Sequence, residues 1–183
     1  MGNFRKGLMA SEDVRTLLVT GAFYGADGNR AEVMDGAVVV VGDLEDHSIY
    51  DGMKDLNTRK LTAPAADTDS VAIVDYDGVS SGEIMGVMYR DGVKTYGLTC
   101  PKGEKVRVRK LWVGDTFWLD KSNFASAPTV GQYAVPTASA VTWTPAASAE
   151  TTKTCIKIEV KKNVTEGTVD THEEYFCTVV NVM

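Results

Sequence analysis

The chain has 183 residues, of which 44% are hydrophobic and 24% charged, an ordinary composition for a soluble globular protein that is long enough to bury a core. The formal net charge of −6 argues against broad nucleic-acid binding, because phosphate contacts need a basic face, and an acidic exterior also repels anionic membranes. Three cysteines, Cys100, Cys155 and Cys177, are too few and odd in number for a disulfide framework. They indicate reduced thiols in a chain folded in a cytoplasm, with a Cys155–Cys177 bond as the alternative.

Residues 1–12 are expected to form an extended N-terminal arm. A basic pair, Arg5-Lys6, is present without an apolar run behind it, so the segment is not a secretory signal. Two interpretations stay open: a frayed tail, or an arm that docks Phe4 and Leu8 on a partner. No stretch of the chain approaches the ~18 apolar residues of a membrane helix.

The first half of the chain predicts short strands separated by turn residues. Asp35-Gly36 is a strong turn dipeptide, and the four valines after Ala37 are typical of a buried strand. Ile49–Leu56 is one of the few places where a helical turn is expected. Further strands are predicted over Val14–Phe23, Ser70–Asp75 and Glu83–Tyr89, with an extended segment from Arg59 to Ala66 and a hairpin dipeptide at Asp91-Gly92.

The central stretch, Val106–Val135, predicts a β meander. Its first residues alternate valine with arginine, which is the period-2 pattern of a half-buried strand. Gly114-Asp115 supplies a turn in which the Asp side chain can bond nearby backbone, and Thr116–Leu119 is β-branched and aromatic.

The C-terminal part predicts an antiparallel hairpin. In Thr154–Lys161, Ile156, Ile158 and Val160 are expected to face the core, and Glu174–Val182 forms the second strand across a long polar loop. The Ala/Ser/Thr/Pro-rich segment 136–149 is interpreted either as a loop or edge segment anchored by one aromatic residue, or as a linker; in the first case the hairpin after it pairs back on the domain.

About ten short strands and no helical stripe predict an all-β fold, a small β-barrel or β-sandwich with an N-terminal arm and a C-terminal β-hairpin. We expect one β-rich domain over residues 13–183.

Catalytic and metal-binding patterns are weak. Asp67, Asp69, Asp75 and Asp77 form two Asp-x-Asp pairs, but the ligand spacing of a calcium loop is incomplete, so solvated carboxylates are expected. His47 and Ser48 are adjacent and would point to opposite faces of a strand. Cys177 and His172 are the remaining nucleophile and base, yet Cys177 lies in an apolar strand where a thiol is normally inert. We therefore expect no enzyme activity, no metal and no cofactor.

Aromatic residues are the other candidates for function. For four of them the favoured role is packing in a core or at an interface, and the alternative is a carbohydrate platform. These four are Trp112, Trp118, Tyr133 and Trp143.

The order of these patterns resembles a known class of proteins. The resemblance rests on Glu32–Val39, Leu61–Pro64 before Asp69–Asp75, Val106–Arg109, Gly114–Leu119 and Pro128–Pro136. Together they are similar to small β-rich proteins of tailed bacteriophages, the head decoration (cement) or auxiliary virion proteins. The chain departs from them at Glu45–Asn57 and Asp77–Asp91, and no residue role is carried over.

This resemblance implies a structural protein on the capsid exterior, folded in the host cytoplasm, that binds the major capsid protein and itself as a homo-oligomer. Contacts to the partner are then expected from Phe4, Leu8, Trp112 and Trp143. The alternative functions are a fibre-like or receptor/glycan-binding module using Trp143 or Tyr133, and an enzyme centred on Cys177 and His172.

Overall fold

A computed structural model describes residues 4–10, 18–46, 53–76, 81–84, 87–90, 99–166 and 170–183. No α-helix occurs within these ranges, and the all-β prediction is confirmed. The first eight strands are β1 (Phe4–Lys6), β2 (Leu18–Phe23), β3 (Val33–Met34), β4 (Val38–Asp46), β5 (Lys54–Thr62), β6 (Ala72–Asp75), β7 (Ser81–Ile84) and β8 (Val87–Arg90). They are followed by β9 (Thr99–Cys100), β10 (Val106–Lys110), β11 (Thr116–Asp120), the 3-10 turn η3 (Lys121–Asn123), β12 (Tyr133–Pro136), β13 (Trp143–Ala146), β14 (Cys155–Glu166) and β15 (Asp170–Asn181).

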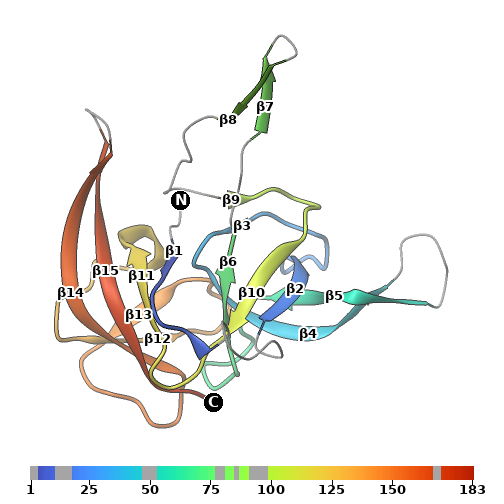
Figure 1. Cartoon of the computed structure of the whole chain (residues 1–183). Helices are drawn as coiled ribbons and strands as arrows, with labels where there is room; N and C mark the ends of the chain where they lie inside the picture. Colours follow the sequence, from blue (N-terminus) through green and yellow to red (C-terminus); the bar gives the residue numbers. More distant parts are fainter. Residues whose placement is uncertain are drawn as a thin grey trace.

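Two larger β structures lie side by side (Figure 1). Five strands close into a barrel in the order β10-β2-β5-β4-β6, with one parallel pair, β2 and β5, among antiparallel ones. Six strands form a sheet in the order β1-β11-β15-β14-β12-β13, in which the long hairpin β14–β15 is central. Two small sheets pair β3 with β9 and β7 with β8. The predicted C-terminal hairpin is thereby confirmed.

The valine run of β4 is buried on both faces because it separates two cores. Val38 and Val40 pack in the cluster between barrel and sheet, whereas Val39 and Val41 pack in the barrel interior. The neighbouring strand β6 alternates in the same way: Ile73 belongs to the first cluster and its neighbours Ala72 and Val74 to the second. A strand enclosed on both sides has no polar face, which explains why the run lacks alternation.

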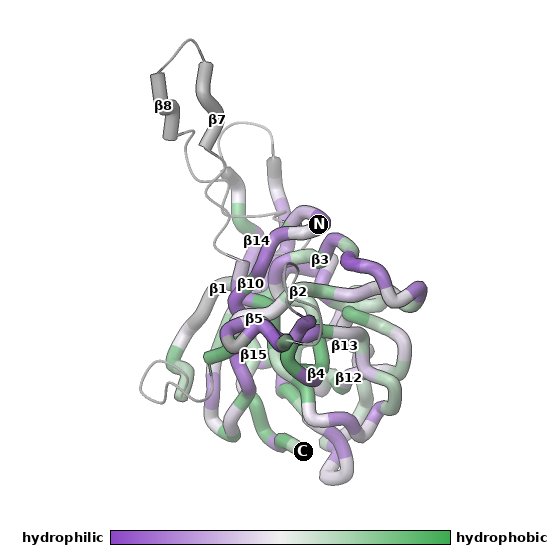
Figure 2. The backbone as a smooth tube through the Cα atoms, turned by 90° about the vertical axis from the view of Figure 1, so that its right-hand side faces the viewer, coloured by the Kyte–Doolittle hydropathy of each residue, from purple (hydrophilic) through white to green (hydrophobic). Residues whose placement is uncertain are grey.

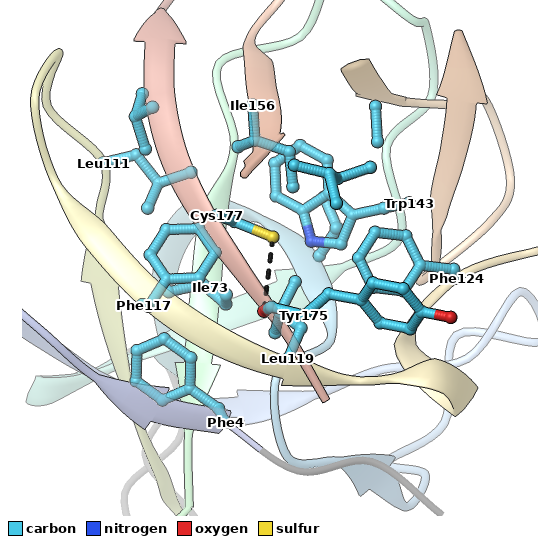
Figure 3. Close-up of a cluster of buried hydrophobic side chains, with 14 of the residues drawn as sticks. Phe4, Ile73, Leu111, Phe117, Leu119, Phe124, Trp143, Ile156, Tyr175 and Cys177 are labelled. Atoms are coloured by element: carbon cyan, nitrogen blue, oxygen red, sulfur yellow. Dashed lines mark hydrogen bonds between the residues drawn. The ribbon is translucent and has the colours of Figure 1, made fainter. Parts of the chain in front are cut away.

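The cluster between barrel and sheet holds the large side chains (Figure 3). Phe124 packs edge-on against Tyr175 with ring centroids 5.5 Å apart, and Trp143 is fully buried beside them. Along the backbone, hydrophilic stretches lie in peripheral loops and also in the strands β5 and β14 (Figure 2). Burial of these rings, each covering on the order of 150–250 Å², is the main force that joins the two β structures.

Two of the three predicted turn dipeptides lie in the described ranges, and both form turns. Gly36 has φ +74° and Ala37 N–H donates to the Met34 carbonyl. Gly114 has φ +95° and Asp115 N–H donates to the Trp112 carbonyl. Glycine adopts this left-handed conformation without the steric cost that a Cβ imposes.

Two predictions about secondary structure are wrong. The helical turn expected over Ile49–Leu56 is replaced, from Lys54 onward, by strand β5, whose Lys54 pairs with Asp46 of β4; residues 49–52 lie outside the described ranges. The linker interpretation of segment 136–149 is also wrong, because β13 within it pairs with β12 and forms the sheet edge. The hairpin dipeptide Asp91-Gly92 lies outside the described ranges.

The C-terminal hairpin differs from its prediction in two details. Val160 is 46% exposed rather than buried, because the register shifts between Ile158 and Val160 and a β-bulge turns the next side chain outward. Strand pairing extends into the predicted polar loop, since it continues to Glu166 opposite Asp170. Its polar residues form strands that are solvated on the surface, so they carry no hydrophobic signal.

Candidate partner-docking surface

The N-terminal segment 4–10 is attached to the chain's own sheet. Strand β1 pairs antiparallel with β11, and the Phe4 N–H donates to Asp35 Oδ2 over 2.8 Å. The Phe4 ring lies 5.6 Å from that of Phe117, and both Phe4 and Met9 are buried. The expectation that Phe4 is presented to a partner is therefore wrong, because its ring fills a place in the core.

Trp143 is likewise buried, with no exposed surface. The expectation that Trp143 contacts a partner is therefore also wrong. Its backbone carbonyl accepts from Ala125 N–H, and its indole Nε1 has no hydrogen-bond partner among the described residues. A platform for glycans or a partner cannot include this ring. Two further members of the predicted platform, Trp118 in β11 and Tyr133 in β12, are half-buried.

The other two expected contacts, Leu8 and Trp112, are exposed and lie near the same turn. Leu8 is 77% exposed, Trp112 58% and the adjacent Val113 52%. We call these three residues the apolar corner. Neighbouring exposed apolar side chains of this size are uncommon on a soluble protein unless a partner covers them.

Asp115 holds the apolar corner together. Its buried carboxylate accepts the N–H of Ala10 at Oδ1 over 2.7 Å and the N–H of Trp112 at Oδ2 over 2.8 Å. One side chain thus joins the N-terminal segment to the turn between β10 and β11. The sequence pattern indicated the local bond to the turn but gave no signal for the bond to Ala10, which is 105 residues away.

Thr116 fixes the position of Leu8. Its N–H donates to the Leu8 carbonyl over 2.7 Å, and Leu8 N–H donates to Thr116 Oγ1 over 2.9 Å. Gly7 lies so close that a Cβ there would be 2.7 Å from the Thr116 carbonyl oxygen. Leu8 is exposed while the next residue, Met9, is buried, so the segment presents one apolar side chain outward from a fixed backbone.

The candidate nucleophile, Cys177, lies in the interior of the sheet. Cys177 is fully buried in the sheet, and burial raises the pKa of its thiol well above the ordinary value. Its Sγ lies 3.6 Å from the Tyr175 carbonyl oxygen (Figure 3), while His172 Nε2 lies 3.1 Å from Glu174 Oε1.

Cys155 and Cys177 are free thiols, paired with Asn181 and Ile158 in the sheet register rather than with each other. His47 lies outside the described ranges.

Three of the four aspartates in the Asp-x-Asp pairs have structural partners. Asp67 accepts from Ala138 N–H and Lys153 Nζ, and Asp69 accepts from the N–H groups of Ala65 and Ala66. Asp75 pairs with Arg107 at 3.0 Å and Arg109 at 2.6 Å. Asp77 lies outside the described ranges, within which no group of three or more metal-ligating side chains is found.

Comparison with models of protein families, with curated proteins and with solved structures finds no match to this chain. In the part of the chain that the structure describes, no helix has the length and apolar character needed to cross a bilayer.

Proposed function

We propose that this chain is a structural virion protein of a tailed bacteriophage, which binds the outer surface of the capsid and stabilises the shell as a decoration or cement protein. The observation that supports this most directly is the apolar corner, where Leu8, Trp112 and Val113 stand exposed on backbone that Asp115 and Thr116 hold in place. Tryptophan is among the residues that contribute most to binding when a partner buries it.

Adhesion to a lattice needs only modest affinity at each site. Contacts repeated over many copies add up through multivalency, and a protein that binds only the assembled shell stabilises it by mass action. The net charge of −6 keeps the free protein soluble and away from the packaged DNA. We propose the major capsid protein as the partner and a small homo-oligomer as the bound form.

The test mixes the purified chain with undecorated heads of the phage whose genome carries this gene, followed by sedimentation and by thermal melting of the shell. The wild-type chain should co-sediment and raise the melting temperature of the shell. Trp112→Ser and Leu8→Ser should each weaken binding by about tenfold or more, equivalent to 1.4 kcal/mol.

Val130→Ser provides a matched control, because Val130 is 49% exposed and outside the apolar corner. This variant should bind as the wild type does. Absence of wild-type co-sedimentation and of any change in shell melting would overturn the proposed function. Equal losses in Val130→Ser and Trp112→Ser would remove the apolar corner as the contact.

A further inference from the structure

A polar cleft lies between the distal half of the β14–β15 hairpin and the segment that follows β11. It has a volume of about 730 Å³, within the range of small-molecule sites. We call it the hairpin cleft. One wall is formed by Asn163 and Thr171–Glu173 of the hairpin, and the other by Asp120–Ser122 and Phe124–Ala127.

The charges in the hairpin cleft neutralise one another. Glu173 accepts from Lys161 Nζ over 2.6 Å and from the Tyr175 hydroxyl over 3.1 Å, and Lys121 Nζ lies 3.4 Å away on the opposite wall. The hydrogen bond from Lys161 lowers the pKa of Glu173, so the carboxylate is ionised at neutral pH. A carboxylate already surrounded by donors does not favour a further ion, which argues against a small cation or anion as the ligand.

Groups that can bind hydroxyls remain around this neutralised centre. The Asn163 side chain is exposed at the cleft, and its amide offers both donors and an acceptor. Asp120 Oδ1 accepts from the backbone N–H and the hydroxyl of Ser122, which fixes the orientation of this carboxylate at the rim. The Thr171 hydroxyl is held 3.4 Å from that of Thr165.

The cleft also has an apolar side. Phe124 lines it, and this ring is held by its edge-on contact with Tyr175. Ala125 and Ala127 add methyl groups along the same segment. A ligand that matches both sides must carry hydroxyl groups along its edges and C–H groups on its faces.

From this arrangement we propose that the hairpin cleft is a binding site for a neutral saccharide of one or two sugar units. Sugar hydroxyls donate to a fixed carboxylate and exchange donor and acceptor roles with an amide, while the C–H face of the ring packs on apolar side chains. The proposal goes beyond capsid binding and depends on residues separate from the apolar corner. It also differs from the platform expected from the sequence, since Trp143 is buried.

Saturation-transfer NMR on the full chain, followed by calorimetric titration, tests the proposal with a panel of neutral mono- and disaccharides and with inorganic phosphate and acetate as anion probes. At least one saccharide should bind at millimolar concentration or tighter. Asn163→Ala and Thr171→Val should each raise the Kd by about tenfold. Asn57→Ala is the control, because Asn57 is exposed on β5 of the barrel and bonds Asp55 Oδ1 through its backbone N–H; it should change the Kd by less than about twofold.

Three outcomes would overturn the saccharide site: no saccharide bound at millimolar concentration, binding of phosphate or acetate alone, or equal affinity in Asn163→Ala and Asn57→Ala. Trp112→Ser should bind saccharide normally. Loss of capsid binding in that variant with retained saccharide binding separates the two proposals, so either can fail without the other.

Discussion

The backbone N–H of Phe4 donates to the carboxylate of Asp35 over 2.8 Å, and these two residues are 31 positions apart in the chain. The other oxygen of the same carboxylate accepts from Tyr76 N–H over 2.9 Å, and the Asp35 carbonyl accepts from Asn123 Nδ2 over 2.7 Å. A single buried residue therefore connects the N-terminal segment, the barrel and the turn after β11. The N-terminal segment is part of the core, and its removal has consequences for stability.

Phe4→Ala should lower the free energy of unfolding by about 3–5 kcal/mol, the usual cost of removing a buried phenylalanine. The reason is loss of the ring packed on Phe117 in the shared core. Urea denaturation followed by tryptophan fluorescence measures the change. Leu8→Ser serves as the control, since Leu8 is 77% exposed and should stay within about 0.5 kcal/mol of the wild type. Equal, small effects in both variants would show that the segment is detached in solution.

Stability should decrease as pH rises from about 4 to about 7. Burial raises the pKa of Asp35 from 3.8 to about 7, with a contribution from the nearby Asp75 carboxylate. The folded state therefore binds more protons than the unfolded state between these values, and the free energy of unfolding falls across this window by up to about 4 kcal/mol. The carboxylates of Asp46 and Asp55 have lowered pKa values, so their contribution is lost only as pH falls below about 4.

Asp35→Asn isolates this effect. The amide cannot ionise, so the decline between pH 4 and 7 should be largely absent in urea titrations of the variant. The NH2 group of the new asparagine must face one of the two backbone N–H donors, from Phe4 or Tyr76. The variant should therefore be less stable than the wild type at pH 4, and the stabilities of the two proteins should be closer at pH 8. Parallel curves for the two proteins would mean that Asp35 does not titrate in this range.

The sequence predicted those features whose signal is local. The valine run after Ala37 lies between two apolar environments, and both glycine turns follow from the backbone conformations that only glycine adopts easily. For the docking surface, the sequence identified Leu8 and Trp112, which are exposed, but could not separate them from Phe4 and Trp143, which are buried. All four are large apolar side chains, and their exposure depends on long-range packing.

Other features were not predictable because their cause is a long-range contact. The bulge that exposes Val160 depends on register between two strands, and a strict alternation of residues gives no sign of it. Asp115 and Asp35 each bond a backbone N–H of the N-terminal segment, and no local pattern identifies such partners. The hairpin cleft combines residues more than 40 positions apart, from Asp120 to Asn163.

Gly36→Ala should be more destabilising than Gly28→Ala, although both glycines have nearly the same φ, +74° and +73°. At Gly36 a Cβ would lie 2.7 Å from Nδ2 of Asn123, which is fully buried, whereas at Gly28 nothing lies within 4 Å. The backbone cost, about 1–2 kcal/mol, is common to both variants. The difference between their unfolding free energies, expected to be roughly 1–3 kcal/mol, measures the close approach alone. Equal values would show that Asn123 moves aside freely.

Asp115→Ala should both destabilise the protein and weaken capsid binding. It removes the acceptor of two N–H groups, from Ala10 and Trp112, at a cost of roughly 1–3 kcal/mol for each donor left unsatisfied. Trp112→Ser should weaken binding with a change in stability within about 0.5 kcal/mol. Urea denaturation and co-sedimentation with undecorated heads are measured on both variants. Together they distinguish a residue that positions the apolar corner, Asp115, from one that contacts the partner, Trp112. Full binding by Asp115→Ala would show that the geometry of the corner is unimportant.

The three cysteines should react with iodoacetamide only as fast as the protein opens. Cys100, Cys155 and Cys177 are all buried, and burial raises the pKa of each thiol, that of Cys100 to about 11. Little thiolate is then present at neutral pH, and the sulfur atoms are shielded from the reagent. Thr151→Cys adds an exposed thiol as an internal control, which should be alkylated at the rate of a model peptide. Mass spectrometry of digested samples gives each rate, and a native Cys177 that reacts as fast as the added thiol would restore the hypothesis of a cysteine-based enzyme.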